Sequence, residues 1–156
     1  VCLISAFSGL RLKNVVHLKR KEVNLKSGWL NIEHQSKTGK PVSIPISPAL
    51  KNVFGLIKVW PMKDKDRFFL DLNEKPISVQ VGRAFNRAGI PWGSFHHFRH
   101  FAACHLINNH VPLEVVREFL GHADIKSTLV YARLKGETLQ DAVRVLDTTL
   151  TQVGGH

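Results

Sequence analysis

The sequence predicts a mainly α-helical domain with one small antiparallel β-hairpin, an α+β fold. Two observations support this fold class. Apolar residues recur at helical spacing along most of the chain, and the two clearest alternating segments lie on either side of a single turn. The chain has 156 residues, enough for one domain with a buried core but not comfortably for two. We therefore expect residues 1–156 to form one domain.

The first predicted elements are helical. Residues 1–7 resemble the tail of a buried helix without a starting cap, so we expect the chain to be part of a longer protein. Ser8 is predicted to cap a second helix over residues 9–22, because a serine hydroxyl can accept hydrogen bonds from a first helical turn. The apolar positions of this helix are Leu10, Val15, Val16 and Leu18.

The predicted hairpin follows these helices. Residues 28–33 and 42–46 alternate as strands do, and the turn at residues 37–40 predicts that they pair antiparallel. Ser47 and Pro48 then predict the start of a helix that reaches about residue 59, since proline suits a first helical turn. We therefore expect the hairpin to lie between two helices.

The remainder is predicted to be helical, after a lysine-rich loop over residues 61–66 and a short strand over residues 67–70. Gly121 ends one helix, because glycine readily adopts the left-handed conformation of a helix C-terminus, and Asp124 caps the next. In chain order these helices are expected over residues 77–88, over 95–109, from Pro112 to Gly121, from Asp124 past Tyr131, and over 137–146, with a frayed tail at 154–156.

Positive charge is concentrated in the first part of the chain. The formal net charge is +10, and residues 1–90 hold 16 Lys and Arg against 6 Asp and Glu, whereas residues 91–156 hold 6 of each. This surplus suits a surface that binds a polyanion, although a basic surface that only confers solubility has the same composition. Charge alone therefore leaves nucleic-acid binding open.

Composition also bears on the compartment. The two cysteines show neither metal-ligand spacing nor a disulfide framework, which fits the reducing cytoplasm. No apolar run approaches the ~20 residues that a bilayer span needs, and no signal-peptide pattern is present. We expect a cytoplasmic protein without a membrane partner.

Two residues that suit phosphate chemistry share one predicted helix. His96 and Arg99 are three residues apart and project from the same side, beside an apolar stripe. We expect both at the edge of the core with their polar ends facing a groove, where Arg99 can present two donors to a phosphate. His96 can relay protons near neutral pH. By itself the pair also fits a helix start with surface histidines.

Arg11 and Tyr131 extend this set. We expect Arg11 in the first turn of its helix, where the macrodipole disfavours a cation, and such a placement suggests a functional role. Tyr131 is the only tyrosine, and its hydroxyl, with an ordinary pKa of about 10, needs nearby cations and a proton acceptor to act as a nucleophile. Arg11, Arg99, His96 and His122 can supply these groups. Considered alone, Arg11 also fits a solvated surface and Tyr131 a half-buried aromatic residue.

A lysine on the hairpin turn is the candidate general acid. Lys37 can swing over a bound backbone and protonate a departing oxygen. Lys40 lies on the same turn and competes for this role. A lysine on an exposed turn is also often simply solvated, so the turn by itself does not decide the function.

Metal binding is the main alternative chemistry for a chain with nine histidines. His96 and His100 are four residues apart and could share a metal with His97 or His105. No cysteine pair, carboxylate cluster or glycine-rich phosphate loop accompanies them in the sequence. We therefore expect no metal and no cofactor.

Taken in order, these segments resemble the catalytic domain of the tyrosine recombinase, or phage integrase, family. The resemblance covers nearly the whole chain and implies the fold of that catalytic domain, with the family's separate N-terminal DNA-binding domain absent here. Its parts are Ser8-Gly9-Leu10-Arg11, the hairpin Ser36-Lys37-Thr38-Gly39-Lys40 with residues 42–46, His96-His97-Phe98-Arg99-His100-Phe101-Ala102, and Leu120-Gly121-His122 followed by Tyr131.

The chain departs from this family pattern near the first arginine. Members usually carry an acidic residue three positions after it, where this chain has Asn14. Asparagine can accept a hydrogen bond but cannot offset charge. The orientation of Arg11 is therefore less certain than the resemblance alone implies, and activity could be impaired.

The resemblance implies site-specific DNA recombination through a 3′-phosphotyrosyl intermediate, without metal or ATP. Tyr131 would attack the scissile phosphate and release a 5′-hydroxyl. The implied supporting roles are non-bridging oxygen contacts for Arg11 and Arg99, a further hydrogen bond from His122, protonation of the leaving oxygen by Lys37, and assistance to proton transfer at the tyrosine by His96.

The resemblance also implies the partners. The expected substrate is a double-stranded recombination site, contacted by Lys13, Lys40, His97 and Lys126. Family members act as tetramers on DNA, often by exchanging the helix after the tyrosine, and residues 137–146 suit that helix, although an isolated fragment could be a monomer.

Two other functions stay open. A type IB topoisomerase-like enzyme shares this chemistry but relaxes DNA, and the short chain and the hairpin lysine favour a recombinase over it. A degenerate, non-catalytic relative would only bind DNA, and residues 112–134 have the outline of a helix-turn-helix. Cleavage that depends on Tyr131 distinguishes these classes, whereas binding alone does not.

Overall fold

The computed structural model describes residues 1–35, 37–57, 67–69 and 72–133. In these ranges the protein is mainly helical with a small antiparallel sheet, which confirms the predicted class. The elements are α1 (Cys2–Ser8), α2 (Leu12–Val16), the 3₁₀ turn η1 (Arg20–Glu22), β1 (Val23–Asn24), β2 (Trp29–Ile32), β3 (Val42–Pro45), α3 (Pro48–Leu56), α4 (Glu74–Arg87), α5 (His96–Asn108), α6 (Leu113–Leu120) and α7 (Lys126–Arg133).

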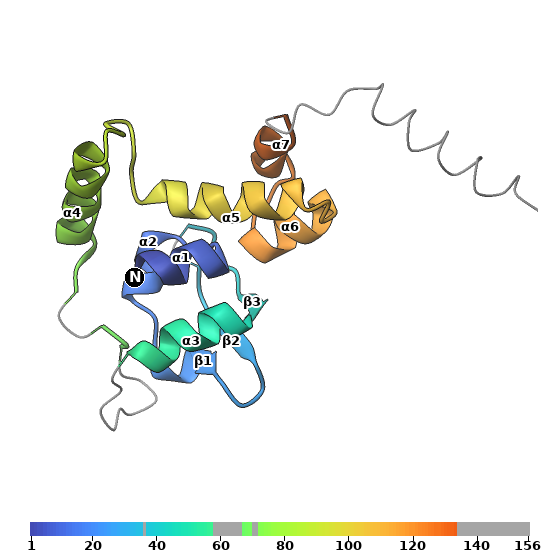
Figure 1. Cartoon of the computed structure of the whole chain (residues 1–156). Coiled ribbons are helices and arrows are strands. Elements are labelled where there is room, and N and C mark those ends of the chain that lie inside the picture. The colour runs from blue at the N-terminus through green and yellow to red at the C-terminus, as the bar shows by residue number, and fades with distance from the viewer. Residues whose placement is uncertain (36, 58–66, 70–71, 134–156) are drawn as a thin grey trace, which may run out of the picture.

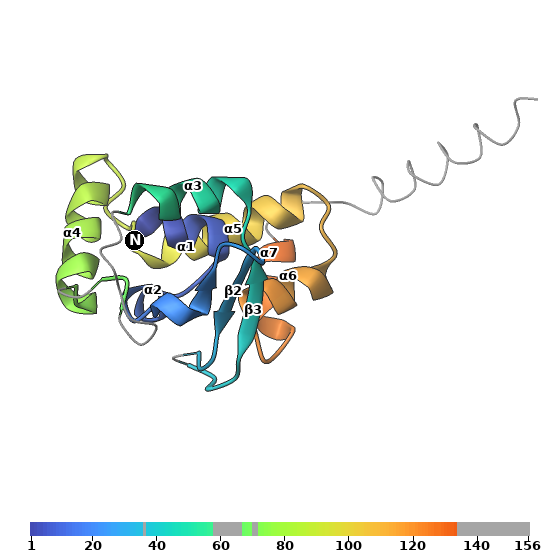
Figure 2. The ribbon, with the colours of Figure 1, turned by 90° about the horizontal axis from the view of Figure 1, so that it is seen from below.

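Helix α1 lies at the centre of the molecule. It packs against α5 on one side and α3 on the other (Figures 1 and 2). Helices α6 and α7 pack on α5 and on each other, and α6 also contacts strand β3. Figure 1 shows α4 beyond the opposite end of α5. The sheet therefore contacts the α5–α7 group through strand β3 and helix α6, and the candidate site lies beside this contact.

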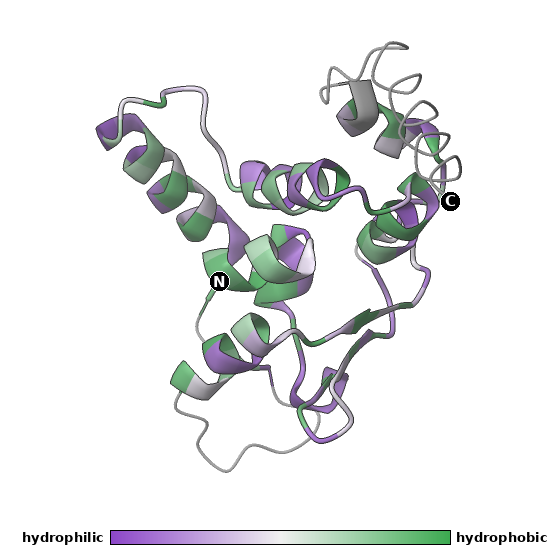
Figure 3. Cartoon of the chain, turned by 45° about the vertical axis from the view of Figure 1, so that its right-hand side comes forward, coloured by the Kyte–Doolittle hydropathy of each residue, from purple (hydrophilic) through white to green (hydrophobic). Residues whose placement is uncertain are grey.

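Three apolar clusters hold these elements together. The largest joins α1, α2, the sheet and α3, and Figure 3 shows α1 to be largely hydrophobic, as its central position requires. The second joins α5, α6 and α7 and includes Tyr131, whereas the third ties α4 to the start of α5. Burial of apolar surface in these clusters is the main force that fixes the position of the site.

The predicted hairpin is confirmed and carries a third strand. Strands β2 and β3 pair antiparallel with Leu30 opposite Ile44, and the short strand β1 pairs with the other edge of β2. Buried and exposed residues alternate along β2 and β3, as expected for a sheet with one face on the core. The alternation of apolar and polar residues did not predict strand β1, because this strand has only two residues.

The predicted helix over residues 9–22, capped by Ser8, is wrong. Helix α2 ends at Val16 and its N-cap is Arg11, while Ser8 is the last residue of α1 and donates its hydroxyl proton to the Ile4 carbonyl at 2.6 Å. Beyond α2 the carbonyl of Leu18 accepts from the Phe68 amide at 2.9 Å. This tertiary pairing, which no local pattern reveals, satisfies the backbone in place of helical bonds.

Several local signals act as predicted. The Ser47 hydroxyl accepts from the Leu50 amide at 3.2 Å at the start of α3. Gly121 ends α6 with φ of 62°, and the Asp124 carboxylate accepts from the Lys126 amide at 3.0 Å at the start of α7. Each signal depends only on neighbours along the chain, which explains its reliability.

Some predictions concern other parts of the chain. The lysine-rich loop over 61–66, part of the strand over 67–70, the helix over 137–146 and the tail lie outside the described residues. Among the helices that are described, none has the length and apolar character required to cross a membrane.

Candidate active site

The six side chains predicted to be catalytic line one cleft. It has a volume of about 300 Å³ and lies where α5, α7 and the β2–β3 turn approach the start of α2. His100, Ser127 and Val130 complete the lining. The predicted residues are Arg11, Lys37, His96, Arg99, His122 and Tyr131.

Arg99 is the most constrained of them. Its side chain projects from α5 into the protein, and the residue is 2% exposed. The two terminal nitrogens donate to the carbonyls of Gly9 at 2.6 Å and Leu120 at 2.8 Å. Arg99 is therefore buried more deeply than the expected position at the edge of the core, although it lines a cleft as predicted. Since a guanidinium has five N–H donors, the remaining ones can still face the cleft.

Arg99 keeps its positive charge although it is buried. Burial, followed by the positive charge of Arg11, lowers the pKa of Arg99 to about 10, while Tyr131 acts in the opposite direction. Arg99 is therefore protonated at neutral pH. In the described ranges no carboxylate forms an ion pair with Arg99 or Arg11. The cleft thus holds two cations that an anionic ligand can neutralise.

Arg11 forms a hydrogen bond to the hairpin. It occupies the extended N-cap position of α2, and one terminal nitrogen donates to Oε1 of Gln35 at 3.2 Å. Burial lowers its pKa, and the nearby Tyr131 hydroxyl opposes that shift. Gln35 is 4% exposed, so this contact lies inside the protein. Sequence reasoning missed Gln35, because its role depends on a contact between distant segments.

Tyr131 belongs both to the cleft and to the core. The residue is 5% exposed and packs in the α5–α7 cluster. Its ring meets the edge of His100 at a centroid distance of 5.3 Å and lies parallel to His122 at 6.5 Å. Burial raises its pKa, although Arg99 and Arg11 act to lower it. The hydroxyl is therefore protonated at neutral pH and needs a proton acceptor to become a nucleophile.

The cleft histidines are neutral at pH 7. Burial and the neighbouring charges of His100, Arg99, Arg11 and His97 lower the pKa of His96 to about 4. A neutral imidazole has one nitrogen that can accept a proton. His96 is thus a possible acceptor for a proton from the cleft.

His122 reaches the same state through a different environment. Burial comes first, followed by Arg99, Arg11, Lys37 and His96, and the pKa falls to about 4. Its Nδ1 lies 2.8 Å from the hydroxyl of the fully buried Thr128. When that hydroxyl donates to Nδ1, Nε2 carries the ring proton and can donate to a ligand. Thr128 is a second residue that sequence reasoning missed.

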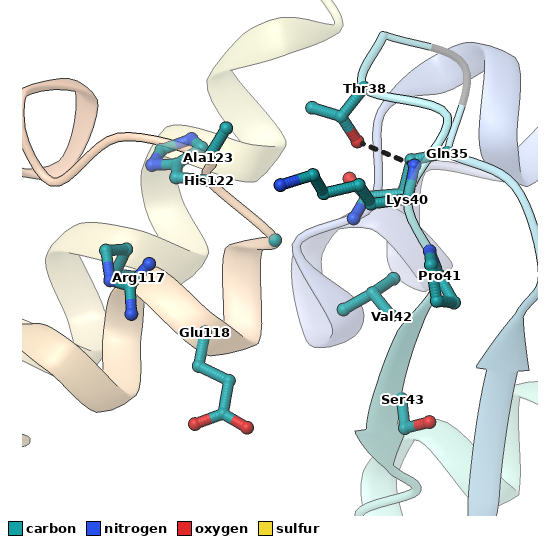
Figure 4. Close-up of a pocket in the computed structure, with 11 residues that line it drawn as sticks. Gln35, Thr38, Lys40, Pro41, Val42, Ser43, Arg117, Glu118, His122 and Ala123 are labelled. Carbon is teal, nitrogen blue, oxygen red and sulfur yellow. Dashed lines mark hydrogen bonds between the residues drawn. The ribbon is translucent and has the colours of Figure 1, made fainter.

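The structure separates the two hairpin lysines. Lys37 lines the cleft, whereas Lys40 lines a neighbouring hollow of about 370 Å³ between β3 and α6. Figure 4 shows the Lys40 side chain extending across that hollow toward His122 and Ala123. Lys37 is therefore the better placed of the two for chemistry at Tyr131.

The remaining predicted DNA contacts are outside the cleft lining. Lys13 on α2 and Lys126 at the start of α7 are exposed. His97 instead packs against Phe85 and Trp92, and its Nδ1 accepts from the Ser94 amide at 3.0 Å. The structure therefore places His97 in the support of the start of α5, outside the cleft lining.

His100 is a further residue of the cleft lining, and its spacing from His96 could have predicted this position. It lies four residues after His96, on the same helical face, and the two rings meet edge to face with centroids 4.5 Å apart. Metal ligation was the alternative use of this pair. Among the residues that the structure describes, no group of three or more His, Cys, Asp or Glu side chains is arranged to hold a metal ion.

Comparison with known proteins gives consistent matches. The chain is 26% identical to the tyrosine recombinase XerA of Pyrococcus furiosus over 164 aligned positions, which cover 100% of this chain and 57% of that protein. It is 28% identical to XerD of Staphylococcus aureus over 139 positions, which cover 81% of this chain and 46% of that protein. The chain thus spans about half the length of these relatives.

Solved structures agree with the observed fold. The catalytic domain of bacteriophage HP1 integrase matches with a TM-score of 0.65 and 27% identity, over 92% of this chain and 79% of that one. The Tn1549 transposon integrase, in complex with transposon right end DNA, matches with a TM-score of 0.74 and 17% identity, over 94% and 57% of the two chains. The model of the phage integrase family matches residues 2–137. The chain therefore belongs to the phage integrase family.

Proposed function

We propose that this protein is a tyrosine-type DNA strand transferase, a site-specific recombinase or integrase. The observation that carries this proposal is the convergence of Tyr131, two arginines, two neutral histidines and Lys37 on one cleft of about 300 Å³. Family membership supports the same chemistry. Its relatives include proteins named tyrosine recombinases.

In the proposed reaction the Tyr131 oxygen attacks a scissile DNA phosphate. A bond forms between that oxygen and phosphorus as the bond from phosphorus to the 5′-oxygen breaks. Arg11 and Arg99 bind the non-bridging oxygens, and His122 donates from Nε2. Such preorganised donors stabilise the charge that develops in the transition state, each typically contributing about 10²–10³ in rate.

Two proton transfers accompany this step. His96 accepts the proton of Tyr131, and a bound phosphate aids it by placing negative charge beside the imidazole, which raises the pKa of the ring. Lys37 donates a proton to the leaving 5′-oxygen. The phosphate remains a diester, now linked to the 3′-oxygen and to Tyr131. Attack by a 5′-hydroxyl can therefore rejoin a strand without ATP.

The proposed substrate is double-stranded DNA. Two structural relatives are recombinases bound to DNA, the Tn1549 integrase and XerH on a palindromic difH substrate. Excess positive charge on this chain suits the same class of partner. We assign DNA contacts to Lys13, Lys40, His97 and Lys126. We also propose that the protein assembles as a tetramer on DNA and acts in the cytoplasm.

The non-catalytic alternative has one feature in its favour. Helices α6 and α7 flank a short loop, as in a helix-turn-helix. However, Arg99 and Tyr131 are only 2% and 5% exposed, whereas residues that read DNA in such modules lie on an open helix face. This burial favours chemistry in the cleft over groove binding by these two residues.

The test is covalent capture on DNA in EDTA. Nicked suicide duplexes with randomised sequence around the nick allow the protein to select its own site, and adducts are recovered under denaturing conditions. We expect an adduct with the wild-type protein and none with Tyr131→Phe, which should bind DNA equally well. DNA binding without any adduct would reject the proposal in favour of a binding module.

A further inference from the structure

We infer that Gln35 is a positioning residue that orients Arg11 and joins it to the junction between α6 and α7. This inference rests on the proposed function, because it assigns the contact a purpose in cleavage. Three independent contacts of Gln35 carry it.

The first contact is made by the side chain. Oε1 of Gln35 accepts a hydrogen bond from Arg11 at 3.2 Å. The amide is almost fully enclosed, since the residue is 4% exposed. A hydrogen bond made to a charged donor is stronger than one between neutral groups, and partial burial reduces the competition of water for this one. Gln35 therefore restricts the directions in which the Arg11 guanidinium can point.

The second contact is made by the backbone at the base of the turn. The Gln35 amide donates to the Lys40 carbonyl at 3.1 Å, and the Gln35 carbonyl accepts from the Gly39 amide at 2.8 Å. These two bonds close the turn that carries Lys37. The residue that holds Arg11 is thus the same residue that anchors the proposed general acid.

The third contact lies beside the cleft, at the neighbouring hollow that Gln35 and Gly121 both line. Gly121 ends α6 with φ of +62°, and a Cβ atom at this position would overlap the side-chain amide of Gln35. The Gln35 amide therefore packs directly on the backbone of Gly121, next to His122. Figure 4 shows Gln35 on the hairpin and His122 on the opposite side of the neighbouring hollow. Gln35 thus occupies the point where the Arg11, Lys37 and His122 segments meet.

The experiment compares single-turnover cleavage by variants of the full chain on a suicide duplex recovered in the capture experiment. Gln35→Met keeps an unbranched side chain of similar length but removes the amide oxygen, and Gln35→Leu is a second apolar variant in case the first does not fold. Gln35→Glu retains an acceptor for Arg11. Asn31→Ala changes an exposed residue of the same hairpin and serves as the matched control.

We expect Gln35→Met to cleave about 10- to 100-fold more slowly than the wild type, with DNA affinity within about 2-fold, because one hydrogen bond to a charged group is lost. Gln35→Glu should recover most of this loss, and Asn31→Ala should match the wild type. Equal cleavage by Gln35→Met and the wild type would overturn the inference.

A second substrate separates positioning from packing. Replacement of one non-bridging oxygen at the scissile phosphate by methyl removes the charge that Arg11 binds. If Gln35 acts through Arg11, the defect of Gln35→Met should shrink to within about 3-fold on this neutral substrate, as expected for coupled sites. A defect of unchanged size would overturn the inference. Failure of the wild-type protein to form a Tyr131 adduct would instead reject the proposed function itself.

Discussion

The two walls of the cleft are built in different ways. In the helical wall, formed by Arg99, His122 and Tyr131, the Arg99 guanidinium and the His122 ring bond to partners inside the protein, and Tyr131 is packed in the core. The hairpin wall is formed by the exposed Lys37 and by Arg11, which bonds the buried hairpin residue Gln35. Each wall thus carries one arginine of the proposed clamp, but two buried carbonyls fix Arg99 whereas one hydrogen bond holds Arg11.

The largest effect is expected from the deepest residue of the helical wall. Arg99→Ala should reduce cleavage by roughly 10³-fold, at the upper end of the loss expected for one preorganised donor. It should also lower the free energy of unfolding by about 3 kcal/mol, because two buried carbonyls lose their donors. Single-turnover cleavage and urea unfolding measure the two effects.

Arg11→Ala is the matched control for this variant. Its cleavage should fall by about 10²–10³-fold, since it removes the second arginine of the proposed clamp. The free energy of unfolding should change by less than about 1 kcal/mol, because Arg11 has one described side-chain bond and is only half-buried. Equal losses of stability in both variants would contradict the proposed difference between the walls.

The hairpin wall is tested through its lysine. Lys37→Ala should slow cleavage by about 10²-fold, at the low end for general acid catalysis. Replacement of the scissile 5′-oxygen by sulfur should restore most of that rate, because a thiolate leaves without prior protonation. The readout is the ratio of the two cleavage rates for each variant.

Lys40→Ala separates proton donation from DNA binding. Lys40 lines the neighbouring hollow and not the cleft, so its loss should weaken DNA binding and show no sulfur rescue. A Lys37→Ala variant that cleaves the sulfur substrate as poorly as ordinary DNA would rule out its assignment as general acid.

The buried histidines predict how stability depends on pH. His96 and His122 have pKa values of about 4 in the folded protein, against about 6.5 when unfolded. Between these values the unfolded chain binds more protons, so the free energy of unfolding should fall as the pH is lowered from about 6.5 to about 4. Urea unfolding at several pH values measures the slope. His122→Gln should flatten it, and an unchanged slope would show that His122 does not titrate as described.

The smallest effect concerns the support of His122. Thr128→Val removes the hydroxyl that lies 2.8 Å from Nδ1, and it should reduce stability by about 1 kcal/mol and cleavage by a few-fold. Thr128→Ser, which keeps a hydroxyl at this position, is the matched control. If both variants behave alike, Thr128 does not fix the orientation of the His122 ring.

Local chemistry accounts for what the sequence predicted well. Ser47, Gly121 and Asp124 mark helix ends through bonds to residues only two to four positions away. The helix over residues 9–22 failed for the opposite reason. Its apolar spacing is real, but the residues after Val16 pack and pair with Phe68, and no window along the chain contains that partner.

The features of the site also divide into those that the local sequence predicts and those that depend on distant contacts. Residue type and order predicted Arg11, Arg99 and Tyr131 as site residues, because few chemistries use this combination, and the structure brings the three into one cleft. Burial of Arg99 could not be predicted, since it depends on the carbonyls of Gly9 and Leu120, 90 and 21 residues away. Gln35 was missed because its significance comes from contacts with segments that fold beside it.

The most direct test of the central claim is to locate the covalent bond. Trypsin cuts after Lys126 and Arg133 and therefore releases residues 127–133, which contain the only tyrosine. After capture in EDTA and digestion of the DNA, mass spectrometry should find a nucleotide linked through a 3′-phosphate to Tyr131 in this peptide. A nucleotide on any other residue, or unmodified peptide in a protein that retains bound DNA, would contradict the account.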